Sequence, residues 1–250
     1  MFRELIHKCE VLYSHDEIKK IEEAYSFACE KHKGRMRLNK TEYMTHPLGV
    51  ALILLDLDVD STTIIAALLH ETINHAGATK EEILEAFGSD VANIVATISK
   101  INRLELTDDS EYSAMNLRKV LVGMSEDIRV LFLKLADRLH NLRTADALNP
   151  EDRKRKVNET MTVLIPIAHR LGMYKIKGEM EDLCLKYSKP DVYEDILERL
   201  NATEKELKTS LEEMEESISE MLTEQNIPFR IKSRVKSVYS IYNKLNNGKT

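Results

Sequence analysis

The sequence DIRVLFLKLADRLHNLRT, residues 127–144, predicts a long helix with two chemically different faces. At about 100° per residue, one side carries apolar residues; these are Ile128, Leu131, Leu135, Leu139 and Leu142. An arc of roughly 80° elsewhere carries polar residues; these are Lys134, Asp137, Asn141 and Thr144, with Arg138 beside them. Such a column can hold a metal ion at one level and a phosphorylated, hydroxylated ligand at the next. Because polar outer faces are the norm, an ordinary solvated face is the favoured interpretation from this helix alone.

The composition favours a mostly helical globular protein. Glycine and proline are scarce, at 8 and 5 of 250 residues, while Leu, Glu, Lys, Ile and Met are plentiful, and this balance favours helices. The length allows one large domain, or one domain and part of another. A net charge of −6 argues against broad electrostatic binding to nucleic acid. A small anion held in a local basic pocket stays compatible with it.

The cysteines and the apolar runs indicate the compartment. Cys9, Cys29 and Cys184 are odd in number and form no CxxC pair, so we expect reduced thiols and neither disulfides nor a zinc site. The first ten residues lack the apolar region and cleavage site of a signal peptide. No apolar run approaches the ~20 residues that span a bilayer. We therefore expect a cytoplasmic protein without membrane association.

Hydrophobic periodicity predicts a series of helices before the long one. They cover residues 16–31, 48–57, 61–73, 80–87, 90–100 and 113–123. The second of them is opened by His46-Pro47, with proline at a favoured first position. The third is apolar nearly all round, so we expect it to be buried. Residues 31–43 form a basic loop in this interpretation, and residues 102–112 form a second loop.

The last third of the chain changes in character. A helix is predicted from Pro150 to residue 164. Beyond Pro190, apolar residues recur in steps of three and four; they are Leu197, Leu200, Leu207, Leu211, Met214, Ile218 and Met221. This stripe indicates a packed connector helix, which Pro228 ends. The following residues begin as an alternating, β-branched stretch and turn helical after Ser237.

Four side chains that can bind a divalent metal ion occur in the order His46, His70, Glu71 and Asp137. Each lies at a predicted helix end or on a helix face, and the intervals between them are long. Two imidazoles and two carboxylates suit Mn²⁺, Fe²⁺ or Zn²⁺, with positions left for water. Such an ion can offset charge on a phosphoryl oxygen. The spacing alone is also compatible with hydrogen-bonded core histidines.

Five segments carry a resemblance to a known family. They are HPLGVALIL (46–54), AALLHETI (66–73), LFLKLADRLHNLRT (131–144), NET with PIAHRLGMYKIKGEMEDLCLKY (158–187) and IKSRVKSVYSIYNKL (231–245). The first four resemble the hydrolase domain of the long RelA/SpoT-type alarmone enzymes. That domain is similar to HD-domain phosphohydrolases, which are marked by a His, a His-Asp pair and a distant Asp. The fifth segment is similar to the opening of the same family's synthetase domain.

The resemblance implies a metal centre and a nucleotide site. It implies that His46, His70 and Asp137 bind one Mn²⁺ per chain, with Glu71 as a fourth ligand. Arg37 matches the arginine that flanks the guanine. The remaining substrate-binding positions match residues that contact the ribose and phosphates or would face phosphate; they are Asn141 and Thr144, then Lys100, Lys134 and Arg138. For the last three, surface or supporting roles are equally compatible.

The C-terminal segment matches the first nucleotide-binding motif of the synthetase domain. The matching positions are Arg234, Lys236, Ser240 and Lys244. The family usually has glycine before the arginine, and this chain has Ser233. We expect GTP pyrophosphokinase activity only where a complete synthetase domain follows.

Two departures from the family pattern affect the expected chemistry. The usual His-Asp pair is His70-Glu71 here, and glutamate keeps the charge but reaches one methylene further. The family's hydrolases place Glu-Asp three and four residues after that acid to handle the attacking water, and this chain has Asn74-His75. Asparagine cannot accept a proton, whereas histidine can. We therefore expect a retained metal centre and weakened proton handling.

Together these observations predict an all-α, HD-type helical bundle over residues 1–195. A connector helix over residues 196–227 and the start of an α/β synthetase domain over residues 228–250 follow. The expected function is that of the N-terminal part of a bifunctional stringent-response protein. Its reaction is Mn²⁺-dependent removal of the 3′-pyrophosphate from (p)ppGpp, giving GDP or GTP. The expected partners are ppGpp, pppGpp, GDP and GTP, and a homodimer is left open.

Two other functions fit the same residues. The first is a hydrolytically silent HD domain that binds nucleotide and regulates an attached synthetase domain. The second is an HD phosphohydrolase that acts on another 3′-phosphorylated nucleotide. Release of pyrophosphate from ppGpp separates the expected function from the first alternative, and a panel of nucleotides tests the second.

Overall fold

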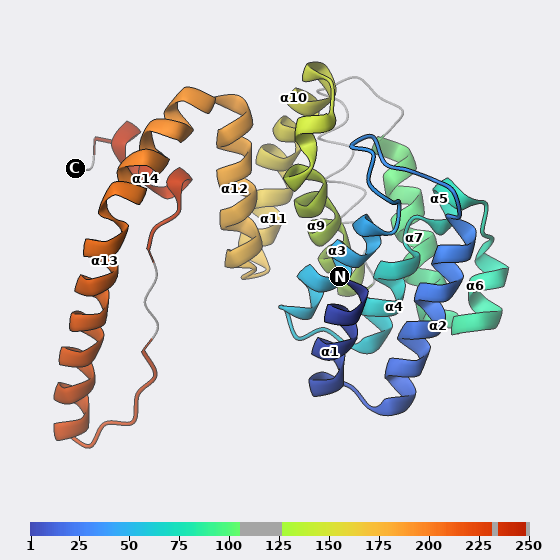
Figure 1. Ribbon diagram of the computed structural model, residues 1–250, viewed down its shortest axis with the longest axis horizontal. Helices are drawn as coiled ribbons and strands as arrows, with labels where there is room; N and C mark the ends of the chain where they lie inside the picture. Colours follow the sequence, from blue (N-terminus) through green and yellow to red (C-terminus); the bar gives the residue numbers. More distant parts are fainter. Residues whose placement is uncertain (106–126, 232–234, 249–250) are drawn as a thin grey trace. The chain divides into compact units, whose positions relative to one another are not determined.

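The computed structural model describes residues 1–105, 127–231 and 235–248, and within them it confirms the expected all-α class (Figure 1). In these residues the only pairing of β type is one isolated bridge between Met36 and Glu42, inside the basic loop. None of the described helices is both long and apolar enough to cross a bilayer. The chain divides into two compact units, Met1–Ile176 and Lys177–Thr250.

The first unit is a bundle of helices. Its elements are α1 (Phe2–Leu12), α2 (His15–Lys31), α3 (Thr45–Leu55), α4 (Ser61–Leu69), α5 (Thr72–Ala76), α6 (Lys80–Phe87), α7 (Ser89–Glu105), α9 (Ile128–Arg143), the 3₁₀ turn Ala145–Ala147, α10 (Pro150–Glu159), the π-helix Thr160–Leu164 and α11 (Ile165–Arg170). Helix α4 packs against α2, α3 and α7, and α9 packs against α3, α4 and α7 (Figure 1). The apolar character of α4 predicted this central position, and eight of its nine residues are buried.

The predicted helix over residues 61–73 is interrupted at His70 and Glu71. Helix α4 ends at Leu69, and a short helix, α5, begins at Thr72. Side chains take over the last carbonyls: Nδ1 of His70 lies 2.6 Å from the carbonyl oxygen of Ala67, and the Thr72 hydroxyl donates to Leu69 at 2.7 Å. Because these side chains satisfy carbonyls that the helix would otherwise use, the chain can turn here.

The helix predicted over residues 80–87 is confirmed as α6, and the helix predicted over residues 90–100 is longer than predicted. Helix α7 continues to Glu105, so residues 102–105 are helical and not a loop. The rest of the expected loop and the expected helix over residues 113–123 fall in the interval 106–126, outside the described residues.

Helix α9 is buried on its polar face as well as on its apolar face. Lys134, Asp137 and Arg138 are 1%, 4% and 1% exposed, whereas Ile128, expected in the core, is 51% exposed. The interpretation of the polar face as solvated was therefore wrong, because α3, α4 and α7 all pack against this helix. Periodicity identifies the faces of a helix but not how many of them are covered.

An arginine at the start of α9 fixes its position relative to α4. Asp127 caps α9 by accepting from the backbone N–H of Arg129 at 2.9 Å. The Arg129 guanidinium donates to Asp60 at 2.9 Å, and Asp60 in turn caps α4 by accepting from the N–H of Thr63 at 2.9 Å. The N-termini of two helices that carry site residues are thus joined by one side chain.

A buried ion pair joins α9 to α10. Nη1 and Nη2 of Arg138 each donate to Glu159 Oε2 at 3.1 Å, and Nη1 also donates to the carbonyl of Lys156 at 3.1 Å. The π-helix begins directly after Glu159, and Pro166 follows it. Proline has no N–H for the carbonyl of Thr162, so a widened turn before it is physically reasonable.

The second unit contains most of α12 (Tyr174–Ser188), together with α13 (Pro190–Glu224) and α14 (Val238–Asn246). Its core is formed by Leu185, Ile196 and Val238. Asp182 on α12 accepts from the backbone N–H of Tyr239 at 2.7 Å and thereby caps α14. The helix predicted after Ser237 is confirmed, because Ser237 is the N-cap of α14.

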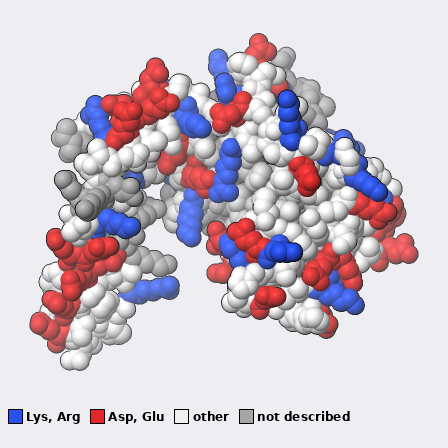
Figure 2. Space-filling model, in the orientation of Figure 1, with Lys and Arg blue, Asp and Glu red and all other residues white. Residues whose placement is uncertain are grey.

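Helix α13 is one continuous helix of 35 residues, as the apolar stripe predicted. Its first part packs in the core of the second unit through Ile196. Farther along, Met214 and Met221 are 60% and 55% exposed, so the stripe is packed at one end only. Acidic side chains gather along this helix (Figure 2). The predicted domain limits at residues 195 and 227 stay a prediction, because compactness alone does not place the end of an enzymatic domain.

The buried pair predicts a large effect on stability. We expect Arg138→Ala to lower the free energy of unfolding by about 3–5 kcal/mol, since it removes the guanidinium that donates two hydrogen bonds to the buried Glu159 carboxylate. Urea denaturation followed by circular dichroism measures this. Arg199→Ala is the matched control, because Arg199 bonds Asp195 on an exposed face and such pairs contribute little. A loss for Arg138→Ala no larger than for the control would contradict the prediction.

Candidate metal centre and adjoining pocket

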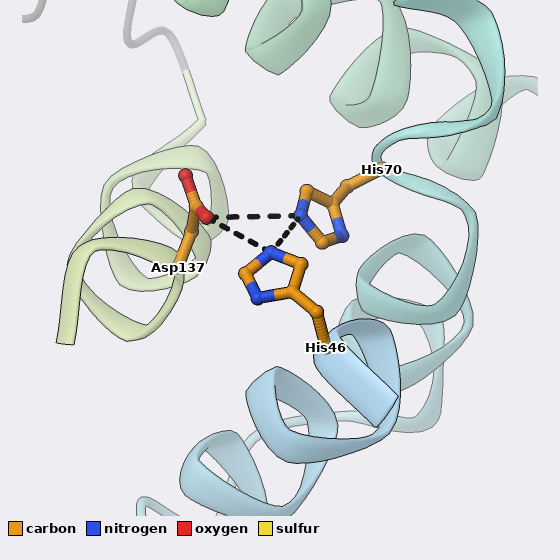
Figure 3. Close-up of side chains that lie close together, drawn as sticks. All are labelled: His46, His70 and Asp137. Atoms are coloured by element: carbon orange, nitrogen blue, oxygen red, sulfur yellow. Dashed lines mark hydrogen bonds and ion pairs between the residues drawn. The ribbon is translucent and has the colours of Figure 1, made fainter. Parts of the chain in front are cut away.

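Three side chains from distant parts of the sequence meet inside the first unit. His46 comes from the first turn of α3, His70 directly follows α4, and Asp137 lies midway along α9 (Figure 3). Nε2 of His46 lies 3.2 Å from Oδ1 of Asp137 and 3.3 Å from Nε2 of His70, and Nε2 of His70 lies 3.9 Å from Oδ1 of Asp137. Both imidazoles are fully buried, and Asp137 is 4% exposed.

The electrostatics of the cluster favour a neutral His70 and ionised carboxylates. Burial lowers the pKa of His70. Burial opposes ionisation of Asp137, but Lys134 and then His46 outweigh it and hold its pKa well below the usual value. Burial likewise opposes ionisation of Glu71, yet His46 and then His70 lower its pKa. Neutral nitrogen and ionised oxygen donors are the forms that bind metal ions.

The residues present fit a divalent metal ion. The three donor atoms lie within 4.8 Å of one another. Nδ1 of His70 faces a carbonyl and so carries the hydrogen, which leaves a lone pair on Nε2 facing Nε2 of His46. Glu71 Oε1 lies 3.7 Å from Nε2 of His46, and its Oε2 is buried without a hydrogen-bond partner. A cation would satisfy both the facing lone pairs and this orphaned oxygen.

A cavity of about 460 Å³ opens beside this centre. Its wall combines the basic loop, the residues after α4, the polar face of α9 and the second half of α10. The residues that line it include Arg37, Tyr43, Glu71, His75, Lys134, Asp137, Asn141, Thr144, Arg155 and Lys156. Of the ten predicted substrate-binding and metal-binding positions, six line this cavity, and His46 and His70 lie in the cluster beside it.

Hydrogen bonds link the cavity wall to the centre. Arg37 donates to Oδ1 of Asn141 at 3.1 Å, and Asn141 Nδ2 donates to Oδ1 of Asp137 at 2.7 Å. Lys134 donates to Asn102 at 2.7 Å and lies 3.5 Å from Asp137 Oδ2. The polar column of α9 therefore connects the metal-binding carboxylate to a cation of the basic loop.

Two of the predicted phosphate contacts lie elsewhere. Lys100 is exposed on α7 and does not line the cavity. Arg138 donates to Glu159 and to the carbonyl of Lys156, and its own side chain does not line the cavity. Arg138 belongs to the same helix face by angle, but its long side chain reaches the neighbouring helix.

The predicted catalytic pair is divided between two environments. His75 lines the cavity, with its ring 6.3 Å from that of Tyr43. Asn74 faces α7: its Oδ1 accepts from Ser99 at 2.6 Å and from Arg103 at 2.9 Å, and its Nδ2 donates to the Ser99 carbonyl at 3.0 Å. Asn74 therefore fastens α5 to α7, and His75 is the member of the pair that can reach a ligand.

The predicted synthetase motif lies in the second unit. Arg234 falls outside the described residues. Ser240 is in the first turn of α14, where its N–H donates to Ser237 Oγ at 3.3 Å. The pKa of Lys236 is lowered by Lys244, through a hydrogen bond and through charge repulsion.

Several residues of the cavity, or of the cluster beside it, had no role predicted from the sequence. Arg155 and Lys156 lie on α10, outside the segments that were singled out. Tyr43 is the last residue of the predicted basic loop, and no role was predicted for it. Its ring lines the cavity and stacks on that of His32, with the centroids 4.3 Å apart. His140, three residues after Asp137, contacts His46 with the Nδ1 atoms 2.9 Å apart. Of these residues, only His140 lies in a segment that carries the family resemblance, ADRLHN at residues 136–141.

Three comparisons place these features among known proteins. A family model described as "HD domain" matches residues 24–174. Escherichia coli (strain K12) "Bifunctional (p)ppGpp synthase/hydrolase SpoT" is 38% identical over 245 residues, 98% of this chain and 35% of its own length. Brucella melitensis biotype 1 "GTP pyrophosphokinase rsh" is 38% identical over 225 residues, 90% of this chain and 30% of its own length.

A solved structure is also similar. A metazoan ortholog of SpoT, described as hydrolysing ppGpp and acting in starvation responses, aligns with a TM-score of 0.49 and 22% identity, covering 68% of this chain and 96% of that one. The chain thus spans about a third of the length of the curated relatives it matches.

The buried His32 predicts a pH-dependent stability. Burial lowers its pKa to about 4 from the usual 6.5, so the unfolded chain takes up a proton between these values that the folded chain does not. The free energy of unfolding must then fall as the pH is lowered through this window. His32→Phe keeps a ring on Tyr43 and removes the titration. Between pH 7 and pH 5, we expect the free energy of unfolding of the variant to fall by about 1–2 kcal/mol less than that of the wild type. Exposed His169→Phe is the control, and equal pH slopes for wild type and His32→Phe would contradict the prediction.

The metal centre predicts a defined stoichiometry. We expect about one divalent ion per chain after dialysis against Mn²⁺, Fe²⁺ or Zn²⁺ in turn, since three buried donors converge on one point. His70→Ala should lose the ion because it removes one of the three donors. Elemental analysis measures both, with exposed His7→Ala as the matched control. Retention of the ion by His70→Ala would show that the ligands are others.

Proposed function

The chain belongs to the HD domain family, and on that premise we propose that it hydrolyses the 3′-pyrophosphate of (p)ppGpp with the help of Mn²⁺. The resemblance to RelA/SpoT-type enzymes is confirmed by 38% identity over 98% of the chain. The observation that carries the proposal is the hydrogen-bonded path from Arg37 through Asn141 to Asp137, because it runs from the cavity wall into the metal centre.

The metal would be held by His46, His70 and Asp137, with Glu71 beside them. When bound, it supplies positive charge that stabilises charge developing on a phosphoryl oxygen. Lys134 adds a second positive charge, since its ammonium lines the cavity and is fixed by Asn102. Positive groups fixed in place before the reaction stabilise the transition state without reorganising.

Recognition of the nucleotide would be shared between the loop and two helices. Arg37 presents a planar guanidinium that can lie against a guanine. Asn141 and Thr144 offer neutral hydrogen-bonding groups to a ribose, one helical turn apart on α9. Arg155 and Lys156 bring cations to the cavity wall from α10, and they suit the second phosphate group of a doubly phosphorylated nucleotide.

Proton transfer would depend on His75. Among the described residues lining the cavity, Asp137 and Glu71 are committed to the metal centre, and Glu159 is paired with Arg138. His75 is then the remaining group able to take a proton from water near the metal. Because a well-placed acid–base group contributes about 10²–10⁴-fold, we propose that binding is retained and hydrolysis is slow.

A second function is favoured by the position of Asn74. Its three hydrogen bonds to α7 make it part of the packing rather than of the reacting surface. A site that binds nucleotide but has lost its acid–base pair could serve as a sensor that regulates an attached synthetase domain. In this proposal residues 1–195 form the nucleotide-binding domain, 196–227 the connector and 228–250 the start of the synthetase domain, in a cytoplasmic protein.

Restoring the carboxylates predicts a gain of activity. We expect Asn74→Glu with His75→Asp to raise the turnover of ppGpp by about 10²-fold or more at saturating Mn²⁺, with the dissociation constant for ppGpp nearly unchanged. Pyrophosphate release and equilibrium binding are measured on the same preparation. His169→Asp, outside the cavity, is the matched control, and His75→Ala should abolish the residual activity.

Each outcome separates the functions. If the wild type hydrolyses ppGpp rapidly and the His75→Ala variant keeps that rate, the proposal of slow hydrolysis through His75 is wrong. Binding without turnover in the wild type, followed by turnover in the double variant, would favour the sensor. Turnover of other 3′-phosphorylated nucleotides in preference to ppGpp would overturn the substrate.

A further inference from the structure

His140 makes a contact with the metal centre that no sequence motif assigns to a function. It lies on α9, three residues after Asp137, and its Nδ1 is 2.9 Å from Nδ1 of His46. The two rings meet edge to face, with their centroids 4.8 Å apart and an interplanar angle of 70°. His140 thus holds the side of the His46 ring that faces away from the other donors.

This contact fixes which nitrogen of His46 carries the hydrogen. Two Nδ1 atoms at 2.9 Å need one donor and one acceptor. Nε2 of His46 points at Asp137 and His70 (Figure 3), so it must keep its lone pair if it is to bind a metal ion. The hydrogen of His46 is then on Nδ1, which donates to His140, and His140 carries its own hydrogen on Nε2.

Gly49 provides the space for the His140 ring. A Cβ atom at residue 49 would lie under 3.0 Å from Cδ2 and Nε2 of His140 and 3.3 Å from its Cε1. Gly49 sits inside α3, one turn after His46, where glycine weakens a helix relative to alanine. Its presence there is explained by the close approach of the ring, because any side chain would displace His140 from His46.

We propose that His140 is a positioning residue that holds His46 in its metal-binding tautomer and orientation. Gly49 leaves the space beside α3 that the His140 ring occupies. The inference rests on the metal centre of the proposed function. Partners of metal-bound histidines commonly change metal affinity by about 10–100-fold when they are removed. His70 has the equivalent partner in the carbonyl of Ala67, so both imidazoles are oriented from behind.

The test measures Mn²⁺ affinity directly, by the electron paramagnetic resonance signal of free Mn²⁺ during titration of the whole chain. We expect Gly49→Ala to weaken Mn²⁺ binding by about 10-fold or more, although it alters no donor. Gly178→Ala is the matched control, since Gly178 lies in α12 with nothing within 4 Å of an added Cβ. That variant should bind as the wild type does. Circular dichroism reports whether each variant is folded.

Two further variants separate positioning from packing. His140→Leu fills space but accepts no hydrogen bond, and it should weaken binding like Gly49→Ala. His140→Gln supplies an acceptor, and it should recover most of the affinity. In a His140→Ala background there is no ring to displace, so adding Gly49→Ala should cause no further loss.

The outcomes distinguish this inference from the proposed function. A folded Gly49→Ala variant with wild-type Mn²⁺ affinity would overturn the role of His140 and leave the proposed function standing. Equal losses for His140→Leu and His140→Gln would also overturn it, because packing alone would then explain the effect. A wild-type chain that binds no Mn²⁺ would overturn the metal centre on which both depend. Should Gly49→Ala fail to fold, the comparison of His140→Gln with His140→Leu still decides.

Discussion

The first unit is built around a carboxylate that is ionised inside a helical bundle. Asp137 is 4% exposed, and a charge at that depth is costly unless other groups compensate it. Lys134 provides a cation one turn away, Asn141 donates a hydrogen bond, and His46 and His70 present their rings. Each of these partners comes from α9 or from a helix packed on it, so the packing of α3 and α4 against α9 and the chemistry of the site are one problem.

The compensation leaves a residual need that a cation would meet. Two imidazole nitrogens face each other across 3.3 Å, and one oxygen of Glu71 is buried without a partner. Interiors rarely leave such groups unpaired without a functional reason. The Arg129 link between the starts of α9 and α4 and the Arg138–Glu159 pair between α9 and α10 lie outside this cluster. They fix the helices so that the donors are held in place before any ligand arrives.

The residues proposed to bind the ligand and the residue proposed to transfer a proton lie on different elements, so one role can weaken without the other. The donors and the polar column lie on α3, α9 and the end of α4, whereas His75 lies on the short helix α5. Asn74 anchors α5 to α7 through three hydrogen bonds. A change at residue 75 therefore alters the group proposed to handle the proton, whereas a change at residue 74 alters the attachment of α5 to α7.

The sequence by itself determined the helical class, the central place of residues 61–69, and the two faces of the helix that bears Asp137, because periodicity and composition are local properties. The motif resemblance also identified His46, His70 and Asp137. Only the tertiary structure decided that the polar face is buried, that Arg138 and Asn74 serve packing, and that Arg155 and His140 belong to the site. Burial and contact depend on which helices cover a face, and that arrangement is set by side chains far away in the chain. His140 and Gly49 show the limit best: each is unremarkable in its own helix, and only the close approach of α9 to α3 gives both of them their role.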